Sequence, residues 1–424
     1  MSNTTPSRRD LNQRADYTFK FNNLSGRHGW LRLTPAYSLK VVEEILRTRD
    51  LRGVVLDPFS GTGTTGLSAA YHGHDAACVE INPFLVWFGR IKVAQYSSQE
   101  ISQLRKNARI VCRGALLDAS PTSPPPPIHN IERWWPASAL RFLCNLKANI
   151  NLVSLGATPV CDLLRVAFCR SLIKLSNAAF NHQSMSFKSS RQSDLLDEIE
   201  GGSQFSSIFL DDVEFVAASA LANPVGACEI VEGDSRLLSS VLKARYDLVI
   251  TSPPYPNRMS FIRELRPYMY WLGFLNDDSR AAGELDWRKI GGTWGIATSR
   301  LNEWEPNPTV YRPRYLELLL GEVAAKQNKS GRLLANYIAK YFEDIWLHLM
   351  ELPKVLELGA EIHYIVGNST FYGVLVPVER IYADMLSQLG FESVSVHALR
   401  KRNSKKELVE FDVTGSYARA SVHA

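Results

Sequence analysis

The chain has 424 residues, of which 45% are hydrophobic and 10% aromatic, as in ordinary globular proteins. This length exceeds one ordinary core, so we expect one large domain with insertions or two to three domains. No apolar run reaches the ~20 residues that a membrane helix needs, and the polar N-terminus lacks the apolar core of a signal peptide. We therefore expect a cytoplasmic protein with no membrane partner. The net charge of +5 is compatible with DNA but identifies no partner.

The six cysteines are scattered along the chain, and none forms a C-x-x-C pair. This spacing predicts neither a zinc site nor a redox motif. We expect no metal, and we interpret each cysteine as a small buried apolar residue.

An amphipathic helix is expected near the N-terminus. Residues 38–46 carry apolar side chains at helical spacing, and Thr34 and Pro35 come shortly before them.

A glycine-rich loop follows the first apolar strand of the sequence, residues 53–57. Gly61 and Gly63 begin a G-x-G-x-x-G pattern, which permits a tight strand-to-helix turn and close approach of a ligand to the backbone. The next predicted strand delivers Glu80 about 20 residues after the loop, the spacing expected of a carboxylate that binds ribose hydroxyls. Taken alone, the loop is equally compatible with a plain tight turn or a dinucleotide site.

A long segment, residues 98–225, separates this strand from the next part of the core. It contains a proline-rich stretch that we expect to be extended polyproline, followed by a helical part at residues 138–176. A polar and basic stretch then includes Lys188 and Arg191, which are candidate contacts to a DNA backbone. An ordinary structural elaboration remains the alternative for this segment.

The most informative motif ends an apolar strand at residues 247–251, where Ser252-Pro253-Pro254-Tyr255 follow. Two prolines fix two φ angles at about −65° and remove two amide donors, so the turn is rigid. In an open α/β sheet, ligands bind at the C-terminal ends of strands. A stiff turn with a hydroxyl and an aromatic ring suits a planar group that is held by acceptors and stacked on the ring.

Basic residues crowd the segment after this tetrad, namely Arg258, Arg263 and Arg266. Residues 275–330, which follow, are rich in predicted turns and interleave tryptophans with basic residues, a composition that suits DNA contact.

The C-terminal part completes the predicted sheet. A long helix is expected to be kinked or broken at Pro353 and ended by Gly359, and Gly390 is expected to stop a later helix. The expected elements are a helix at 336–358, a strand at 361–368, a helix at 376–389 and strands at 391–399 and 408–413.

Together the two motifs resemble the S-adenosylmethionine-dependent amino-methyltransferases that modify exocyclic amines of DNA bases. That family carries D-P-F-x-G-x-G and [D/N/S]-P-P-[Y/F], and both occur here in full, at 57–63 and 252–255. The surrounding strand pattern extends the resemblance to about half of the chain. It implies an α/β fold with a Rossmann-like methyltransferase sheet and a C-terminal antiparallel hairpin. The largely helical insertion at 98–225 is an expectation from this sequence, and its place between the second and third core strands departs from the family's common arrangements.

The resemblance also implies S-adenosyl-L-methionine as cofactor. Asp57 is expected to hold the methionine ammonium group, Glu80 the ribose hydroxyls and Asp234 the adenine. The other expected cofactor-binding residues are Thr34, Pro35, Phe59, Gly61 and Gly63.

The tetrad is expected to be catalytic. A sulfonium methyl group is already activated, so the enzyme mainly has to align the amine at roughly 3–3.5 Å. The Ser252 hydroxyl and the Pro253 carbonyl, held in place by Pro254, would accept hydrogen bonds from that amine, and Tyr255 would stack on the base. The base must first be flipped out of duplex DNA.

Serine at the first tetrad position favours cytosine N4 over adenine N6, which is the alternative. No Pro-Cys dipeptide occurs, unlike in the cytosine-C5 methyltransferases. A catalytically silent nucleic-acid-binding protein is an alternative of another class. The expected partners are double-stranded DNA and a cognate restriction endonuclease, in a prokaryotic cytoplasm, and the sequence does not set the oligomeric state.

The predicted organisation has six parts. They are a cofactor-flanking segment (1–50), the cofactor loop (51–97), a helical insertion with a target-recognition role (98–225), the tetrad region (226–274), a second insertion with the same candidate role (275–330) and the rest of the core (331–424).

Overall fold

The structure of the protein is a computed structural model. It describes residues 11–23, 25–31, 37–48, 53–117, 121–153, 158–179, 186–187, 202–257, 260–276, 279–292, 296–326, 330–402 and 408–418. Within these ranges no helix combines the length and the apolar character that crossing a bilayer requires.

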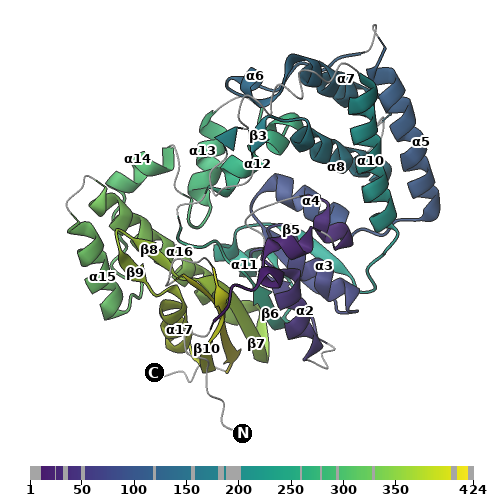
Figure 1. Ribbon diagram of the computed structural model, residues 1–424. Coiled ribbons are helices and arrows are strands. Elements are labelled where there is room, and N and C mark those ends of the chain that lie inside the picture. Colours follow the sequence, from purple (N-terminus) through teal and green to yellow (C-terminus); the bar gives the residue numbers. More distant parts are fainter. Residues whose placement is uncertain are drawn as a thin grey trace.

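A seven-stranded sheet lies at the centre of the core (Figure 1). Five neighbouring strands, β7 to β5 in the order below, are parallel, whereas β11 runs antiparallel to both β7 and β10. This arrangement confirms the predicted α/β class, the methyltransferase-like sheet and the C-terminal antiparallel hairpin. In spatial order the strands are β10 (Phe391–Lys401), β11 (Val409–Tyr417), β7 (Leu356–Gly367), β6 (Tyr246–Thr251), β1 (Val55–Asp57), β2 (Ala76–Glu80) and β5 (Cys228–Glu232).

Strands β1 and β2 are buried along their whole length. Every residue of β1 and β2 is buried, because helices cover both faces of a parallel sheet. Helix α2 begins after Ser38, whose side chain accepts a hydrogen bond from the Lys40 amide and so caps the first turn, as an N-cap serine does. The helices of the core and its N-terminal flank are α1 (Phe19–Asn22), α2 (Leu39–Arg47), α3 (Thr64–Tyr71), α4 (Pro83–Val93), α11 (Leu238–Val241), α16 (Gly331–Val355) and α17 (Val378–Gln388), with short 3-10 turns η1 (Ala15–Tyr17), η2 (Gly26–Gly29) and η3 (Ser235–Leu237).

The first insertion is helical and packs on α4 (Figure 1). One hydrophobic cluster runs from Phe84 and Phe88 of α4 through the insertion helices to Trp271, so the insertion shares its core with the catalytic part. Arg27 strengthens this junction, since its guanidinium donates to the carbonyls of Lys92 and Ala220. The elements are α5 (Ser98–Ala115), α6 (Ile131–Trp134), α7 (Ala137–Val153), α8 (Pro159–Lys174), β3 (Ala178–Ala179), β4 (Ser186–Phe187) and α10 (Gly202–Ala220).

The prediction that residues 275–330 are dominated by turns was wrong. After α12 (Phe261–Trp271) this segment forms α13 (Ser279–Arg288), α14 (Ile296–Glu303) and α15 (Arg314–Ala324). Each helix is only two to three turns long, so its apolar periodicity is weak in the sequence, and packing against α16 and its neighbours stabilises it.

The C-terminal elements match the predicted order, with corrections at one junction. Helix α16 passes through Pro353 and ends at Val355, and β7 begins at the next residue. Gly359 therefore lies inside the strand, with φ +84°, and does not end the helix. A proline this close to a helix end disturbs few later hydrogen bonds. Gly390, with φ +82°, follows α17 as predicted. A small hairpin, β8 (Ser369–Phe371) and β9 (Val374–Val376), completes the fold.

Candidate functional site

The two sequence motifs meet where the chain changes direction across the sheet. Strand β1 lies between β2 and β6, and all three are parallel, so their C-terminal ends share one edge. This is the topological switch point at which open α/β sheets bind ligands. The Thr251 hydroxyl donates to a carboxylate oxygen of Asp57 at 2.6 Å, which joins the start of the tetrad directly to the start of the glycine loop.

The glycine loop has the conformation that its spacing predicts. Gly61 and Gly63 have φ angles of +51° and +71°, in the left-handed region that favours glycine. Gly66 serves helix packing, because a Cβ atom there would lie 2.5 Å from the sulfur of Cys78 and 2.6 Å from that of Cys228. The loop therefore turns tightly into α3 and keeps that helix close to the sheet.

Asp57 is fully buried, and hydrogen bonds from the described residues reach only one of its two carboxylate oxygens. Its Oδ1 atom accepts from the Thr251 hydroxyl and from the Phe59 amide at 3.0 Å. Its Oδ2 atom accepts no hydrogen bond from the described residues. Burial raises the pKa of the carboxyl group to about 6. A buried acceptor without a partner is costly, so this oxygen suits a cationic donor from a ligand.

Glu80 lies at the end of β2 with both oxygens fixed by the backbone. The Gly61 amide donates to Oε2 at 2.9 Å, and the Asn82 amide donates to Oε1 at 2.8 Å. A carboxylate oxygen can accept more than one hydrogen bond, so the group can still receive hydroxyl donors. The Nζ atom of Lys289 lies 3.9 Å from Oε1. Burial lowers the pKa of this lysine.

Asp234 is already engaged in an ion pair. It caps the turn after β5 by accepting from the Arg236 amide, and its other oxygen lies 2.7 Å from the Arg236 guanidinium. Arg236 also pairs with Asp344 and donates to the Arg288 carbonyl. Any contact between Asp234 and a cofactor would therefore use a carboxylate that Arg236 orients.

The tetrad is held by the C-terminal part of the chain. The Tyr255 hydroxyl donates to Glu410 at 2.9 Å, and the Arg402 guanidinium lies over the Tyr255 ring, 4.8 Å from its centroid. A Cβ atom on Gly367 would approach a ring carbon of Tyr255 to 2.8 Å, so only glycine fits there. The Tyr341 hydroxyl of α16 donates to the carbonyl of Pro254 at 2.8 Å. Ser252 itself is half-buried at the end of β6.

Of the other predicted site residues, some have a described position in the structure and some lie outside its described part. Phe59 packs edge-on against the ring of His348, with centroids 4.6 Å apart. Arg263 is half-buried and Arg266 is exposed, both on α12, which begins shortly after the tetrad. The predicted residues that lie outside the described part of the chain are Thr34, Pro35, Lys188, Arg191 and Arg258.

The sequence did not reveal the role of Lys92, whose side chain contacts the backbone of the glycine loop. This lysine of α4 is fully buried, and its ammonium group donates to the Thr62 carbonyl at 2.7 Å. Burial lowers its pKa to about 7. The available signal was its helical position, one turn after the buried Phe88.

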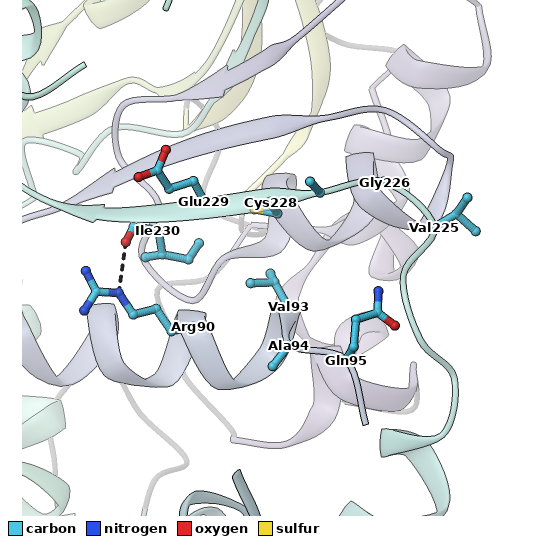
Figure 2. A pocket seen from close by; sticks show the side chains of 10 residues that line it. Arg90, Val93, Ala94, Gln95, Val225, Gly226, Cys228, Glu229 and Ile230 are labelled. Carbon is cyan, nitrogen blue, oxygen red and sulfur yellow. Dashed lines mark hydrogen bonds between the residues drawn. The ribbon is translucent and has the colours of Figure 1, made fainter. Parts of the chain in front are cut away.

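A cavity lies away from these motifs. It measures about 560 Å³ and lies between α4 and β5 at the free edge of the sheet, where the Arg90 Nε atom donates to the Ile230 carbonyl at 3.0 Å (Figure 2). No motif residue lines it. Among the described residues, no group of three or more His, Cys, Asp or Glu side chains is placed to hold a metal ion.

Comparison with known proteins finds relatives along nearly the whole chain, although no protein-family model matches. Type II methyltransferase M.BsoBI of Geobacillus stearothermophilus is 20% identical over 452 aligned residues, covering 96% of this chain and 86% of that protein. Type II methyltransferase M.AvaI of Nostoc sp. and of Anabaena variabilis is 22% identical over 426 residues, covering 92% of this chain and 85% of that protein.

Two solved structures are similar at low TM-scores. TrmN from Thermus thermophilus has a TM-score of 0.32 and 9% identity, with 95% of this chain and 53% of that chain covered. The rRNA methyltransferase aviRa from Streptomyces viridochromogenes has a TM-score of 0.28 and 11% identity, with 90% and 86% covered. At these scores the two structures support no conclusion about the site.

Replacing Lys92 by methionine is expected to change how stability depends on pH. The ordinary pKa of 10.5 falls to about 7 in the folded chain, so between these values the unfolded chain binds one more proton at this group. The stability of the wild-type protein therefore rises with pH across this window, with a contribution of about 1.4 kcal/mol per pH unit. Urea unfolding at pH 7–9.5 should show a slope that is smaller by this amount in Lys92→Met.

The control for this experiment is Lys326→Met, an exposed residue two positions after the end of α15, which should keep the wild-type slope. A wild-type slope in Lys92→Met would mean that the buried lysine is not neutral in the folded protein.

Proposed function

We propose that this chain, a member of the S-adenosylmethionine-dependent DNA methyltransferases, transfers a methyl group to the N4 amine of a flipped-out cytosine in duplex DNA. The membership predicted from the two motifs is confirmed by the Type II methyltransferase relatives, and methyltransferases of this type use S-adenosylmethionine as methyl donor. The function in a restriction–modification system also follows these relatives. The choice of cytosine, the residue roles, the cognate endonuclease and a cytoplasmic location are our proposals.

One observation carries the proposal: the Thr251–Asp57 hydrogen bond of 2.6 Å. It joins the residue just before Ser252 to the acid that begins the glycine loop. Methyl transfer requires donor and acceptor within roughly 3–3.5 Å of each other in line. A cofactor on the loop and a base on the tetrad would meet at this junction.

The residues at the loop fit the cofactor. The unpartnered Oδ2 atom of Asp57 would accept from the methionine ammonium, Glu80 would accept from ribose hydroxyls, and Asp234 would face the adenine. Gly61 and Gly63, which are left-handed, carry no Cβ atoms, so a ligand can approach the backbone closely at these two positions. The bound cofactor supplies an activated sulfonium methyl group.

The tetrad residues would hold the base. The Ser252 hydroxyl and the Pro253 carbonyl would accept hydrogen bonds from the exocyclic amine and direct its lone pair towards the methyl group. Tyr255 would stack on the base, while Glu410 fixes its hydroxyl and Arg402 covers its ring. Serine at the first tetrad position favours cytosine over adenine in this family, which is why we propose N4.

Phosphate contacts would offset the cost of flipping the base, which is a few kcal/mol. Arg263 and Arg266 of α12 follow the tetrad closely, and we assign them to the DNA backbone together with Arg258, Lys188 and Arg191. Binding to DNA should therefore weaken as salt rises, because bound phosphates release counterions.

Cofactor affinity is expected to depend on pH through Asp57. Binding of the ammonium group needs the ionised carboxylate, so affinity should fall about tenfold per pH unit below the pKa of about 6. Without ligand, the contribution of Asp57 to the stability of the folded chain changes with pH in the opposite direction to that of a carboxylate whose pKa folding lowers. This contribution is fully present below the unfolded pKa of 3.8 and is lost as pH rises through about 6. Calorimetric titration with S-adenosylmethionine from pH 5 to 8 measures the affinity.

Asp57→Asn should bind roughly tenfold to a hundredfold more weakly and lose this pH dependence. The exposed Asp211→Asn on α10 is the control and should behave like the wild type. An affinity of the wild type that does not change with pH would refute the role of Asp57.

Substitutions in the tetrad, or in the residue that hydrogen-bonds to Tyr255, should reduce methyl transfer without weakening cofactor binding. Ser252→Ala and Tyr255→Ala are expected to abolish methylation while S-adenosylmethionine still binds. Glu410→Leu should lower kcat about tenfold or more, because Tyr255 loses a charged hydrogen bond, whereas Glu410→Gln keeps an acceptor and most of the activity. Single-turnover methylation and calorimetry separate the two effects.

Glu392→Leu, on the exposed surface of the same hairpin, is the matched control for these variants. Near-normal turnover in Ser252→Ala or Tyr255→Ala would remove the proposed roles of the tetrad.

The product itself tests the choice of base. DNA incubated with labelled cofactor, digested to nucleosides and separated by chromatography should contain N4-methylcytosine. N6-methyladenine as the sole product would contradict the choice of cytosine but leave the reaction class standing. Label in RNA or protein alone would contradict DNA as substrate, and cofactor binding without any transfer would identify a silent binding protein.

A further inference from the structure

A second cavity, of about 350 Å³, lies between helix α4 of the core and helices α7, α8 and α12. None of the residues that line it belongs to the glycine loop or the tetrad. It opens to solvent beside the exposed Asn151 and Gly273. Its size falls at the lower end of the range for small-molecule sites.

Aromatic side chains line this cavity; those of Trp87 and Phe274 are partly exposed, whereas those of Phe168 and Trp271 are buried. Trp87 and Phe274 have ring centroids 5.9 Å apart, and Phe168 and Trp271 have centroids 5.6 Å apart. The Trp87 indole N–H donates to Asp162 at 3.0 Å, which sets the orientation of that ring. Rigid rings lose little entropy when a flat ligand packs on them.

Two donors on residues that line the cavity have no acceptor among the described residues. The Trp271 indole Nε1 is buried without a hydrogen-bond partner in the described part of the chain, which is uncommon for a buried polar group. Lys147 forms no ion pair with a carboxylate of the described residues, and burial lowers its pKa. Its Nζ atom lies 6.0 Å from the Trp271 ring. The charge of Arg165 is matched by Asp162, 3.0 Å away, so Lys147 is the cation that remains for a ligand.

We propose that this cavity binds a nucleotide, with the base against the partly exposed rings of Trp87 and Phe274 and the phosphate on Lys147. Flat π surfaces bind every nucleobase by stacking, and the cation and the buried N–H supply what an anionic acceptor needs. A cationic ligand is disfavoured by Lys147, and an inorganic anion alone would leave the aromatic walls without a partner.

The nucleotide can come from bound DNA or from solution. Helix α12 begins just after the tetrad and ends at Trp271, and its 11 residues span about 16 Å. That length equals on the order of five base steps of DNA. A nucleotide some steps from the flipped base can therefore reach the cavity.

The test is calorimetric titration of the full chain in a Tyr255→Ala background, which removes stacking at the tetrad. We expect saturable binding of dCMP and weaker binding of deoxycytidine, which lacks the phosphate. Lys147→Met should weaken dCMP binding about tenfold or more, and Trp271→Phe, which keeps a ring but removes the N–H, should weaken it as well. Lys106→Met, on the exposed face of α5, is the matched control and should bind dCMP normally.

Three results would overturn the proposal. They are no saturable binding of dCMP, binding that Lys147→Met and Trp271→Phe leave unchanged, and equal affinity for dCMP and inorganic phosphate. If a duplex oligonucleotide displaces dCMP, the nucleotide comes from DNA, and if both bind together, it comes from solution. Methyl transfer plays no part in this measurement, so failure of the proposed activity and failure of this cavity give different results.

Discussion

The hydrogen bond between Thr251 and Asp57 is the constraint on which the candidate site depends. It joins the ends of β6 and β1, which are 194 residues apart in the chain, at the centre of the sheet. Removing it would take from Asp57, a buried acid, one of the hydrogen bonds that offset the cost of its burial. The same bond joins the tetrad to the glycine loop, the two segments that we propose to hold the base and the cofactor.

Around this junction, each motif is supported by a part of the chain that the motif itself does not contain. The glycine loop rests on Lys92 of α4, and the tetrad rests on Glu410, Arg402 and Tyr341. Glu410 also pairs with Arg400, so the C-terminal hairpin presents a charged pair to the tyrosine hydroxyl. The hairpin therefore has two roles, since it closes the edge of the sheet and also orients the ring proposed to stack on the base.

The sequence predicted what local rules determine. Glycine spacing predicted left-handed turns at Gly61 and Gly63, and apolar runs predicted the buried strands, because both depend on a few neighbouring residues. Contacts between residues that are far apart in the sequence were not predictable from local patterns. Glu410 lies 155 residues from Tyr255, and no local pattern marks it. The short helices of residues 279–324 were missed for the same reason, since packing decides whether helices of this length form.

The second insertion lies closer to the cofactor residues than its sequence position indicates. The Lys289 ammonium is 3.9 Å from Glu80, and the Arg288 carbonyl accepts from Arg236, which pairs with Asp234. Of the two acids that we assign to the adenosyl group, Glu80 therefore has a cationic neighbour just after α13, and Asp234 is linked to the end of α13 through Arg236. A ligand that engages Glu80 and Asp234 must share these acids with the insertion or displace it. Because a shared contact couples two binding events reciprocally, any DNA contact made through α13 would respond to cofactor binding.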